Sequence, residues 1–162
     1  MRFLFSIALL GLLLSCNKEK KLLNRLNDHT WNIDQSIRSV IDQDGNETIF
    51  EDGQNAGTIS IYDDPLGFDG LKEAHFIYTN YLGQTSDFIA TFYVNEDATR
   101  VGFAGALCNS PFECDLLFTV SENKKKSQVW TAYGSDNTYF FPPDTYNANK
   151  VDHIKWQLRL SR

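Results

Sequence analysis

The feature that most constrains the fold of this chain is an alternation of apolar and polar residues with a period of two. In residues 153–160 every second side chain is apolar, and Ile154 and Trp156 begin the apolar series. Side chains two positions apart lie on the same face of a β-strand. This segment therefore predicts a strand with one buried face.

The same alternation recurs along most of the chain, and clusters of Gly, Asn, Asp and Pro interrupt it. We expect strands at 31–41, 48–50, 58–62, 73–82, 86–95, 100–107, 116–120, 128–133, 138–141 and 153–160. Only residues 20–27 suggest a helix, which would be short and would carry three leucines on one face. Many strands joined by tight turns predict an all-β meander.

The expected strands also indicate how the sheet is covered. In the first, Trp31, Ile33, Ile37 and Ile41 fall on one parity, so we expect them to share the buried face. In residues 73–95 both parities carry apolar groups, which favours a closed or double-layered sheet over an open one. We therefore predict an antiparallel up-and-down β-barrel of about eight strands, with a β-sandwich as the alternative.

The N-terminus predicts export. A single positive charge at Arg2 is followed by a short apolar run that ends near Leu14, which is typical of a secretory signal peptide. The run is shorter than the roughly 20 apolar residues that a spanning helix needs. Its end, 13–16, reads Leu-Leu-Ser-Cys and resembles the lipobox of bacterial lipoproteins, which implies that Cys16 carries the lipid.

These features predict three parts of the chain. We expect a signal peptide at 1–15, a lipidated cysteine with a polar tether at 16–28, and a β-barrel domain at 29–162. The acyl chains on Cys16 would anchor the protein to a membrane, because each buried methylene contributes about 0.8 kcal/mol. The expected location is the cell envelope, with the outer membrane as the default.

Two further cysteines, Cys108 and Cys114, enclose a five-residue loop. In an oxidising compartment such a pair predicts a disulfide, which would stabilise the fold by roughly 2–3 kcal/mol. Free thiols and a pair of metal ligands are the alternatives. A zinc site needs further ligands, and no spacing in the sequence supplies them.

The charge balance argues against nucleic acid as a partner. The formal net charge is −6, and the one basic run, Lys124 to Lys126, falls between two expected strands and is best explained as a hairpin turn in water.

Acidic pairs occur at Asp42/Asp44, Glu51/Asp52 and Asp63/Asp64, and we expect all of them in solvated turns. A calcium ion held by Asp63, Asp64 and Asp69 is the alternative for the last turn.

The sequence carries no recognisable catalytic motif. The three histidines, His29, His75 and His153, belong to no zinc or nucleophile pattern. We therefore expect a protein that is not an enzyme and that uses no cofactor. A hydrolase with an unrecognised site is kept as an alternative, and a cleft that holds a histidine beside a carboxylate would favour it.

Aromatic residues are abundant, with 12 Phe, 7 Tyr and 3 Trp. In a barrel they can either fill the core or line a cavity for an apolar ligand. The candidate ligand contacts are Tyr78, Phe92, Phe103, Trp130 and Tyr139.

Several of these elements together resemble the lipocalin-like lipoproteins common in Bacteroidetes. The resemblance is carried by Leu26 spaced from Trp31, the turn 44–46, the segment 57–59 and the final strand with Trp156. It implies an eight-stranded barrel in which Trp31 is a structural plug at one end. The chain departs from the pattern directly before Trp31, where His29 and Thr30 stand in place of the usual glycine.

The sequence thus predicts a lipid-anchored envelope protein that binds a small apolar ligand without catalysis. A structural or assembly partner in an envelope protein complex is the first alternative, and the unrecognised hydrolase is the second.

Overall fold

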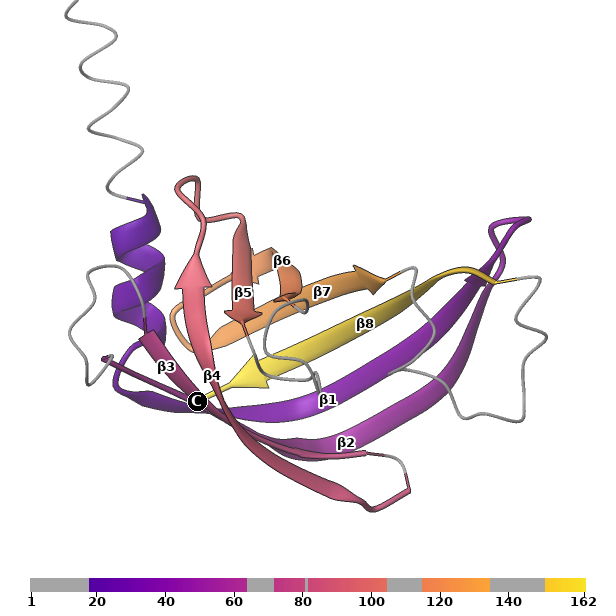
Figure 1. The fold of residues 1–162 in the computed structure, drawn as a ribbon, viewed down its shortest axis with the longest axis horizontal. Helices are drawn as coiled ribbons and strands as arrows, with labels where there is room; N and C mark the ends of the chain where they lie inside the picture. The colour runs from indigo at the N-terminus through magenta and orange to yellow at the C-terminus, as the bar shows by residue number, and fades with distance from the viewer. Residues whose placement is uncertain (1–17, 64–71, 81, 105–114, 135–150) are drawn as a thin grey trace, which may run out of the picture.

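The computed structural model describes residues 18–63, 72–80, 82–104, 115–134 and 151–162. Within these ranges a helix at 18–26 precedes eight strands (Figure 1). The strands are β1 (His29–Asp42), β2 (Glu47–Asp63), β3 (Lys72–Thr79), β4 (Thr85–Val94), β5 (Arg100–Ala104), β6 (Asp115–Asn123), β7 (Ser127–Gly134) and β8 (Val151–Ser161).

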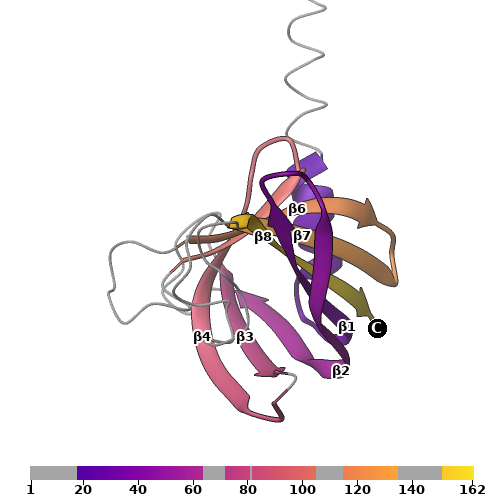
Figure 2. The ribbon, with the colours of Figure 1, turned by 90° about the vertical axis from the view of Figure 1, so that its right-hand side faces the viewer.

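The strands form a closed antiparallel barrel. Each strand pairs with the next one along the chain, and β8 closes the sheet by pairing with β1. Figures 1 and 2 show the strands arranged around one interior, with the helix at one end. The prediction of an up-and-down barrel is confirmed, and the sandwich alternative is wrong. Closure gives every strand a neighbour on both sides, although β2 pairs with β3 only over residues 57–63 and β4 pairs with β5 only over residues 91–94.

The helix gives the barrel two distinct ends. We call the end where β1 begins and β8 finishes the helix end, because the helix leads directly into it. The opposite end, the far end, carries the tight turn from β1 to β2 at 42–46 and the connection from β3 to β4. The first of these turns matches the expectation, since Asp42 accepts hydrogen bonds from the backbone N–H groups of Asp44 and Asn46.

The helix is part of the folded unit. Leu22 and Leu26 are both fully buried and belong to the same hydrophobic cluster as the barrel residues. These two leucines lie one turn apart on the helix and therefore point to the same side. Residues 18–26 fall within the predicted tether at 16–28, and Leu22 and Leu26 pack this helix on the barrel. In the described residues no helix is long and apolar enough to cross a membrane.

A bulge interrupts the alternation in β1. Its pairing with both β2 and β8 shifts between Ile33 and Gln35. Asp34 is the extra residue relative to β8, whereas β2 has two unpaired residues opposite it, 55 and 56. The Asp34 carboxylate accepts a 2.8 Å hydrogen bond from the Ser161 hydroxyl. One inserted residue turns every later side chain to the other face of the sheet.

The bulge corrects the predicted buried face of this strand. Beyond Asp34 the buried residues are Ser36, Ser39 and Val40, while Ile37 and Ile41 are only half-buried. The expectation that these two isoleucines share a face with Trp31 is therefore wrong. The predicted alternation of buried residues holds at Trp31 and Ile33, and after the bulge it is reversed at Ser36 and Val40.

The two short strands expected at 48–50 and 58–62 are a single strand, β2. Its middle is irregular, with positive φ at Asn55 and at Gly57, where φ is +139°. A Cβ on Gly57 would lie only 1.9 Å from the carbonyl oxygen of Ile77 on β3. Glycine is required here because the two backbones approach too closely for a side chain.

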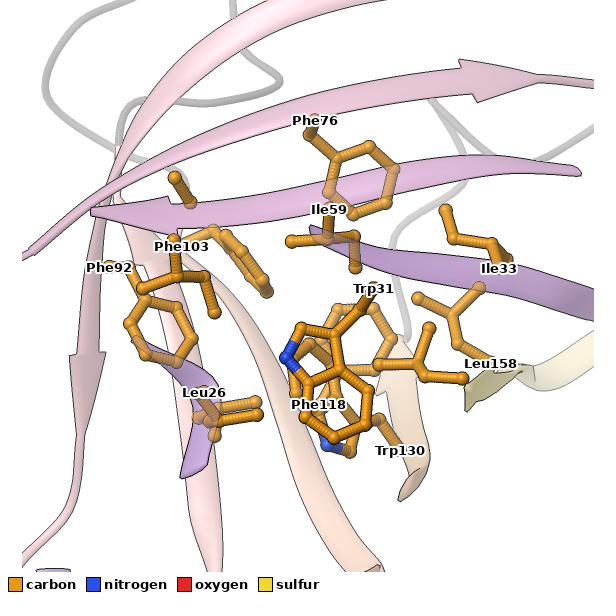
Figure 3. Close-up of a cluster of buried hydrophobic side chains, with 14 of the residues drawn as sticks. Leu26, Trp31, Ile33, Ile59, Phe76, Phe92, Phe103, Phe118, Trp130 and Leu158 are labelled. Atoms are coloured by element: carbon orange, nitrogen blue, oxygen red, sulfur yellow. The ribbon is translucent and has the colours of Figure 1, made fainter. Parts of the chain in front are cut away.

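The core at the helix end is built from aromatic rings and helix leucines (Figure 3). Phe103 lies near its centre, with its ring centroid 5.3 Å from that of Phe92, 6.0 Å from that of Phe118 and 6.1 Å from that of Trp130. Tilted and edge-on contacts of this kind contribute about 0.5–1.5 kcal/mol each beyond the buried area. The rings come from β4 to β7, so the cluster ties half of the barrel wall together.

The remaining elements agree with the sequence in most places. Lys124 to Lys126 form the exposed connection between β6 and β7, as expected. The inward series of β8 is buried, as the alternation predicted. The strand expected at 138–141 lies outside the described residues.

Candidate functional site

A group of polar side chains lies inside the barrel, among mostly apolar residues. It consists of Ser36, Arg38, Glu51, Tyr78 and Trp156, and we refer to it as the interior polar cluster. The register explains why three of them meet: Arg38 on β1 is the cross-strand partner of Trp156 on β8 and of Glu51 on β2. Residues directly opposite one another on neighbouring strands point to the same face of the sheet.

Hydrogen bonds join the members of the cluster. Glu51 Oε1 accepts hydrogen bonds from the Tyr78 hydroxyl and, at 3.3 Å, from Ser36 Oγ. Ser36 Oγ also accepts a 2.9 Å hydrogen bond from the indole N–H of Trp156 and lies 2.9 Å from the Tyr78 hydroxyl. Ser36 reaches these partners only because the bulge at Asp34 turns it inward.

Arg38 supplies the positive charge of the cluster. Its Nε lies 3.6 Å from Glu51 Oε2, and its guanidinium carbon lies 4.6 Å from the ring centroid of Trp156 and 5.1 Å from that of Tyr78. The side chain of Arg38 is 12% exposed and that of Glu51 is fully buried. A guanidinium near two aromatic faces and a carboxylate is held by both cation–π and ionic attraction.

Burial also sets the protonation state of Tyr78. Its pKa is raised to about 12, mainly because burial disfavours the phenolate, and the Arg38 charge acts in the opposite direction. Its hydrogen bond to Glu51 raises the pKa further, because it stabilises the protonated hydroxyl. The Tyr78 hydroxyl is therefore neutral at physiological pH and donates to the carboxylate.

One acceptor of the cluster has no hydrogen-bond partner among the described residues: Glu51 Oε2. Its contact with Arg38 Nε is longer than a hydrogen bond. An ion pair removed from water is costly unless its atoms are fully satisfied, and well-packed apolar residues often stabilise a fold equally well. Stability alone therefore does not account for this cluster.

The interior polar cluster lies directly against the aromatic core. The Trp156 ring centroid is 5.4 Å from that of Tyr78, 5.4 Å from that of Phe118 and 6.4 Å from that of Phe76. A polar group surrounded by rings can fix the orientation of a mostly apolar molecule. The barrel thus combines apolar walls with one charged and hydrogen-bonding patch.

The structure places the predicted ligand contacts in two settings. Tyr78 belongs to the interior polar cluster. Phe92, Phe103 and Trp130 are fully buried against one another in the aromatic core, where they fill space. Tyr139 lies outside the described residues. The ligand-binding role of these side chains stays a prediction.

Trp31, the predicted plug, is fully buried at the helix end with Leu22 and Leu26 (Figure 3). The guanidinium carbon of Arg162 lies 5.4 Å from its ring centroid. The helix therefore covers this end together with the tryptophan.

The histidines do not form a catalytic site in the described residues. His75 Nε2 lies 2.5 Å from Asp87 Oδ1, but their side chains are 37% and 64% exposed. Ser60 is the cross-strand partner of His75, yet its hydroxyl hydrogen-bonds that of Thr30 at 2.8 Å. A catalytic serine would need its hydroxyl on the histidine, so this arrangement gives the hydrolase alternative no support.

The acidic residues are divided between surface and interior. Asp63 pairs with Lys72 at the surface, and this ion pair and hydrogen bond hold the pKa of its carboxyl below the usual range. Asp64 and Asp69 lie outside the described residues, and no metal-binding group occurs among those that are described. Glu51 contradicts its prediction, because it lies buried in β2 and not in a solvated turn.

The cysteines lie outside the described residues. This holds for the lipidation candidate, Cys16, and for the predicted disulfide partners, Cys108 and Cys114. Lipidation and the disulfide both stay predictions.

Sequence reasoning missed Ser36, Arg38, Glu51 and Trp156 as a group. Arg38 lies on a strand whose alternation the bulge reverses, and Glu51 was expected in a turn between two strands. No local signal marks the bulge, because Asp34 falls on the polar parity of the expected strand.

No protein-family profile matches the chain, and no curated protein matches it. Similar solved structures include an apocrustacyanin C1, at 10% identity and a TM-score of 0.48, with 91% of this chain and 66% of that chain covered. This chain thus spans slightly less than two thirds of that one.

A lipocalin-like protein from Bacteroides uniformis is 11% identical, with a TM-score of 0.40 and coverage of 85% of this chain and 99% of that one. A de novo designed fluorescence-activating β-barrel is 12% identical, with a TM-score of 0.41 and coverage of 85% and 95%. These neighbours include a lipocalin-like barrel, and at such identities the likeness concerns the fold alone.

Proposed function

We propose that this protein is a lipid-anchored binding module of the bacterial cell envelope that holds a small, largely apolar molecule inside its barrel. An eight-stranded barrel is wide enough to be filled by side chains or to hold one small ligand. The proposal involves no catalysis and no cofactor.

The observation that carries the proposal is the interior polar cluster. Arg38 and Glu51 form an ion pair whose side chains are 12% and 0% exposed, among mostly aromatic and aliphatic buried residues. Removing each ion of such a pair from water costs on the order of several kcal/mol, before the attraction between the two ions is counted. A few convergent polar groups in an apolar interior are typical of sites that orient a ligand.

Native mass spectrometry of the protein purified from its own host tests the proposal. We expect a mass in excess of the polypeptide and its modifications that disappears on denaturation. The denatured sample of the same preparation is the control, because it retains covalent additions and loses bound molecules. A bare mass under conditions that preserve the fold would contradict the proposal.

The anchoring part of the proposal rests on the lipobox-like end of the apolar run. Cys16 precedes the first described helical residue, Lys18, by two positions. Two residues reach at most about 7 Å, so lipid on Cys16 would hold the helix end of the barrel close to the bilayer. The far end would then face away from that membrane.

Fractionation tests the anchor. We expect Cys16→Ser to move the protein from the membrane fraction to the soluble fraction, because the acyl chains supply the attachment. Ser15→Ala is the matched control, since it leaves the cysteine in place. Membrane association of Cys16→Ser equal to that of the wild type would exclude lipidation as the anchor.

An assembly partner is the second candidate function, and one observation favours it. Leu82 and Ile89 are 63% and 61% exposed, in and beside the hairpin formed by β3 and β4. Exposed large apolar side chains on one hairpin can mark a contact with another protein. A bare native mass together with loss of complex formation in a Leu82→Ser/Ile89→Ser variant would favour this function over ligand binding.

A further inference from the structure

The chemistry of the interior polar cluster restricts what the barrel can hold. Three hydrogen-bonding groups of the cluster already donate within it: the Trp156 indole to Ser36, the Ser36 hydroxyl to Glu51, and the Tyr78 hydroxyl to Glu51. Glu51 Oε2 is a fully buried acceptor that accepts no hydrogen bond from the described residues, and Arg38 Nε lies 3.6 Å from it. A carboxylate oxygen accepts up to two hydrogen bonds, so this atom keeps acceptor capacity even with Arg38 at its edge.

We propose that the ligand is an uncharged molecule with an apolar body and a hydroxyl or N–H group that donates a hydrogen bond to Glu51 Oε2. This inference rests on the proposed function, since it names the ligand class of the same site. It distinguishes the ligand from a fatty acid or another carboxylate.

The charge of the cluster supports an uncharged ligand. Arg38 and Glu51 already neutralise one another at a separation of 3.6 Å. A carboxylate ligand would place a second negative charge beside Glu51, whose side chain is fully buried, and an added charge is costly where it is removed from water. A cationic ligand would place a second positive charge beside Arg38.

The rings around the cluster support an apolar body. Trp156 and Tyr78 lie edge to face with centroids 5.4 Å apart, and Phe76 stacks on the partly buried Phe88 at 5.0 Å. Phe88 is less buried than the rings at the helix end, so the aromatic wall continues from the closed core toward accessible space.

Four water-soluble probes with one ring and different head groups test this inference. They are benzyl alcohol, which donates a hydrogen bond; benzyl methyl ether, which only accepts; benzoate, an anion; and benzylammonium, a cation. Binding is followed in ¹⁵N-labelled protein, as its own host produces it, by the indole N–H signals of the three tryptophans. Trp156 reports on the cluster, while Trp31 and Trp130 report on the closed core.

We expect benzyl alcohol to shift the Trp156 signal and to bind about tenfold more tightly than the ether, because only the alcohol satisfies the buried acceptor. Benzoate and benzylammonium should both bind more weakly than the alcohol. The Trp31 and Trp130 signals should move little.

The variant Glu51→Gln tests the assigned atom. Glutamine has nearly the same shape, and its amide group can both donate and accept. We expect it to reduce the preference for alcohol over ether to about twofold or less. Glu47→Gln is the matched control, because Glu47 lies on the same strand, pairs with Lys155 and is 39% exposed. It should leave the preference unchanged.

The outcomes separate the two proposals. If none of the probes moves the Trp156 signal, the proposed function fails, and this inference fails with it. If benzoate binds most tightly, or if Glu51→Gln keeps the full preference for the alcohol, the site binds ligands but the assignment to a donor on Glu51 Oε2 is overturned.

Discussion

Removing the charge of Glu51 should destabilise the barrel, because Arg38 would keep its charge without a counterion. Breaking a buried ion pair by removing one partner costs about 3–5 kcal/mol. Arg38 is 12% exposed and would retain its contacts with the rings of Trp156 and Tyr78. Because such cation–π contacts are worth about 0.5–2 kcal/mol, we expect Glu51→Gln to lower the free energy of unfolding by about 2–3 kcal/mol.

The double variant should recover most of this loss. Arg38→Met/Glu51→Gln removes both charges and keeps an unbranched side chain between the rings. We expect its free energy of unfolding to lie within about 1 kcal/mol of the wild type. The coupling energy of the pair, from a double-mutant cycle, should then be about 2 kcal/mol. Urea unfolding followed by tryptophan fluorescence measures these values.

A pair on the outer face of the barrel is the control. Glu47 and Lys155 lie 3.1 Å apart, with side chains 39% and 25% exposed. Their coupling energy should be below about 0.5 kcal/mol, because solvent screens the attraction. Equal coupling for the two pairs, or a loss below about 0.5 kcal/mol in Glu51→Gln, would show that the Arg38–Glu51 pair is screened by water. The reasoning about a buried charged site would then be refuted.

Three further predictions concern stability. Trp31→Ala should lower the free energy of unfolding by roughly 3–5 kcal/mol, since it empties a fully buried site at the helix end, and a loss under about 1 kcal/mol in urea unfolding would contradict the plug role. Gly57→Ala should cost about 2–4 kcal/mol in the same assay, because its Cβ would collide with the Ile77 carbonyl, whereas Gly45→Ala, with nothing within 4 Å of the added Cβ, should cost less. The pKa of Tyr78 is about 12, above that of the unfolded chain, so the folded state holds its proton longer and stability should fall as pH rises from about 10 toward 12. Tyr78→Phe should show a shallower fall over that range, and an identical slope would count against burial of the hydroxyl.

The sequence predicted the barrel because the alternation is a local property. In β8 the inward residues Ile154, Trp156 and Leu158 are buried as the pattern required, and β3 and β4 follow it equally well. An apolar face on every strand needs a common interior, and about eight strands of this length suffice to close one. Fold class therefore followed from periodicity alone.

The site did not follow, because it depends on contacts between distant residues. The bulge at Asp34 is stabilised by Ser161, which lies 127 positions away, and no local pattern gives that contact. In an unbroken alternation that places Trp31 and Ile33 inside the barrel, Ser36 and Arg38 would face outward. Glu51 was expected in a turn, since the irregular middle of β2 separated two apparent strands.

A short helix was expected at 20–27, but its packing on the barrel was not, for a similar reason. Its leucines suggested one apolar face, but a chain segment between a lipid anchor and a domain also explains a short amphipathic stretch. Only the packing of Leu22 and Leu26 against the barrel decides between the two.

The central claim is that the interior polar cluster holds a small molecule, and a paired native mass spectrum tests it most directly. The wild type and the Arg38→Met/Glu51→Gln variant are purified from the same host and measured under conditions that keep both folded. The account predicts an added, non-covalent mass on the wild type that is absent from the variant. A bare wild type, or the same added mass on both proteins, would contradict it.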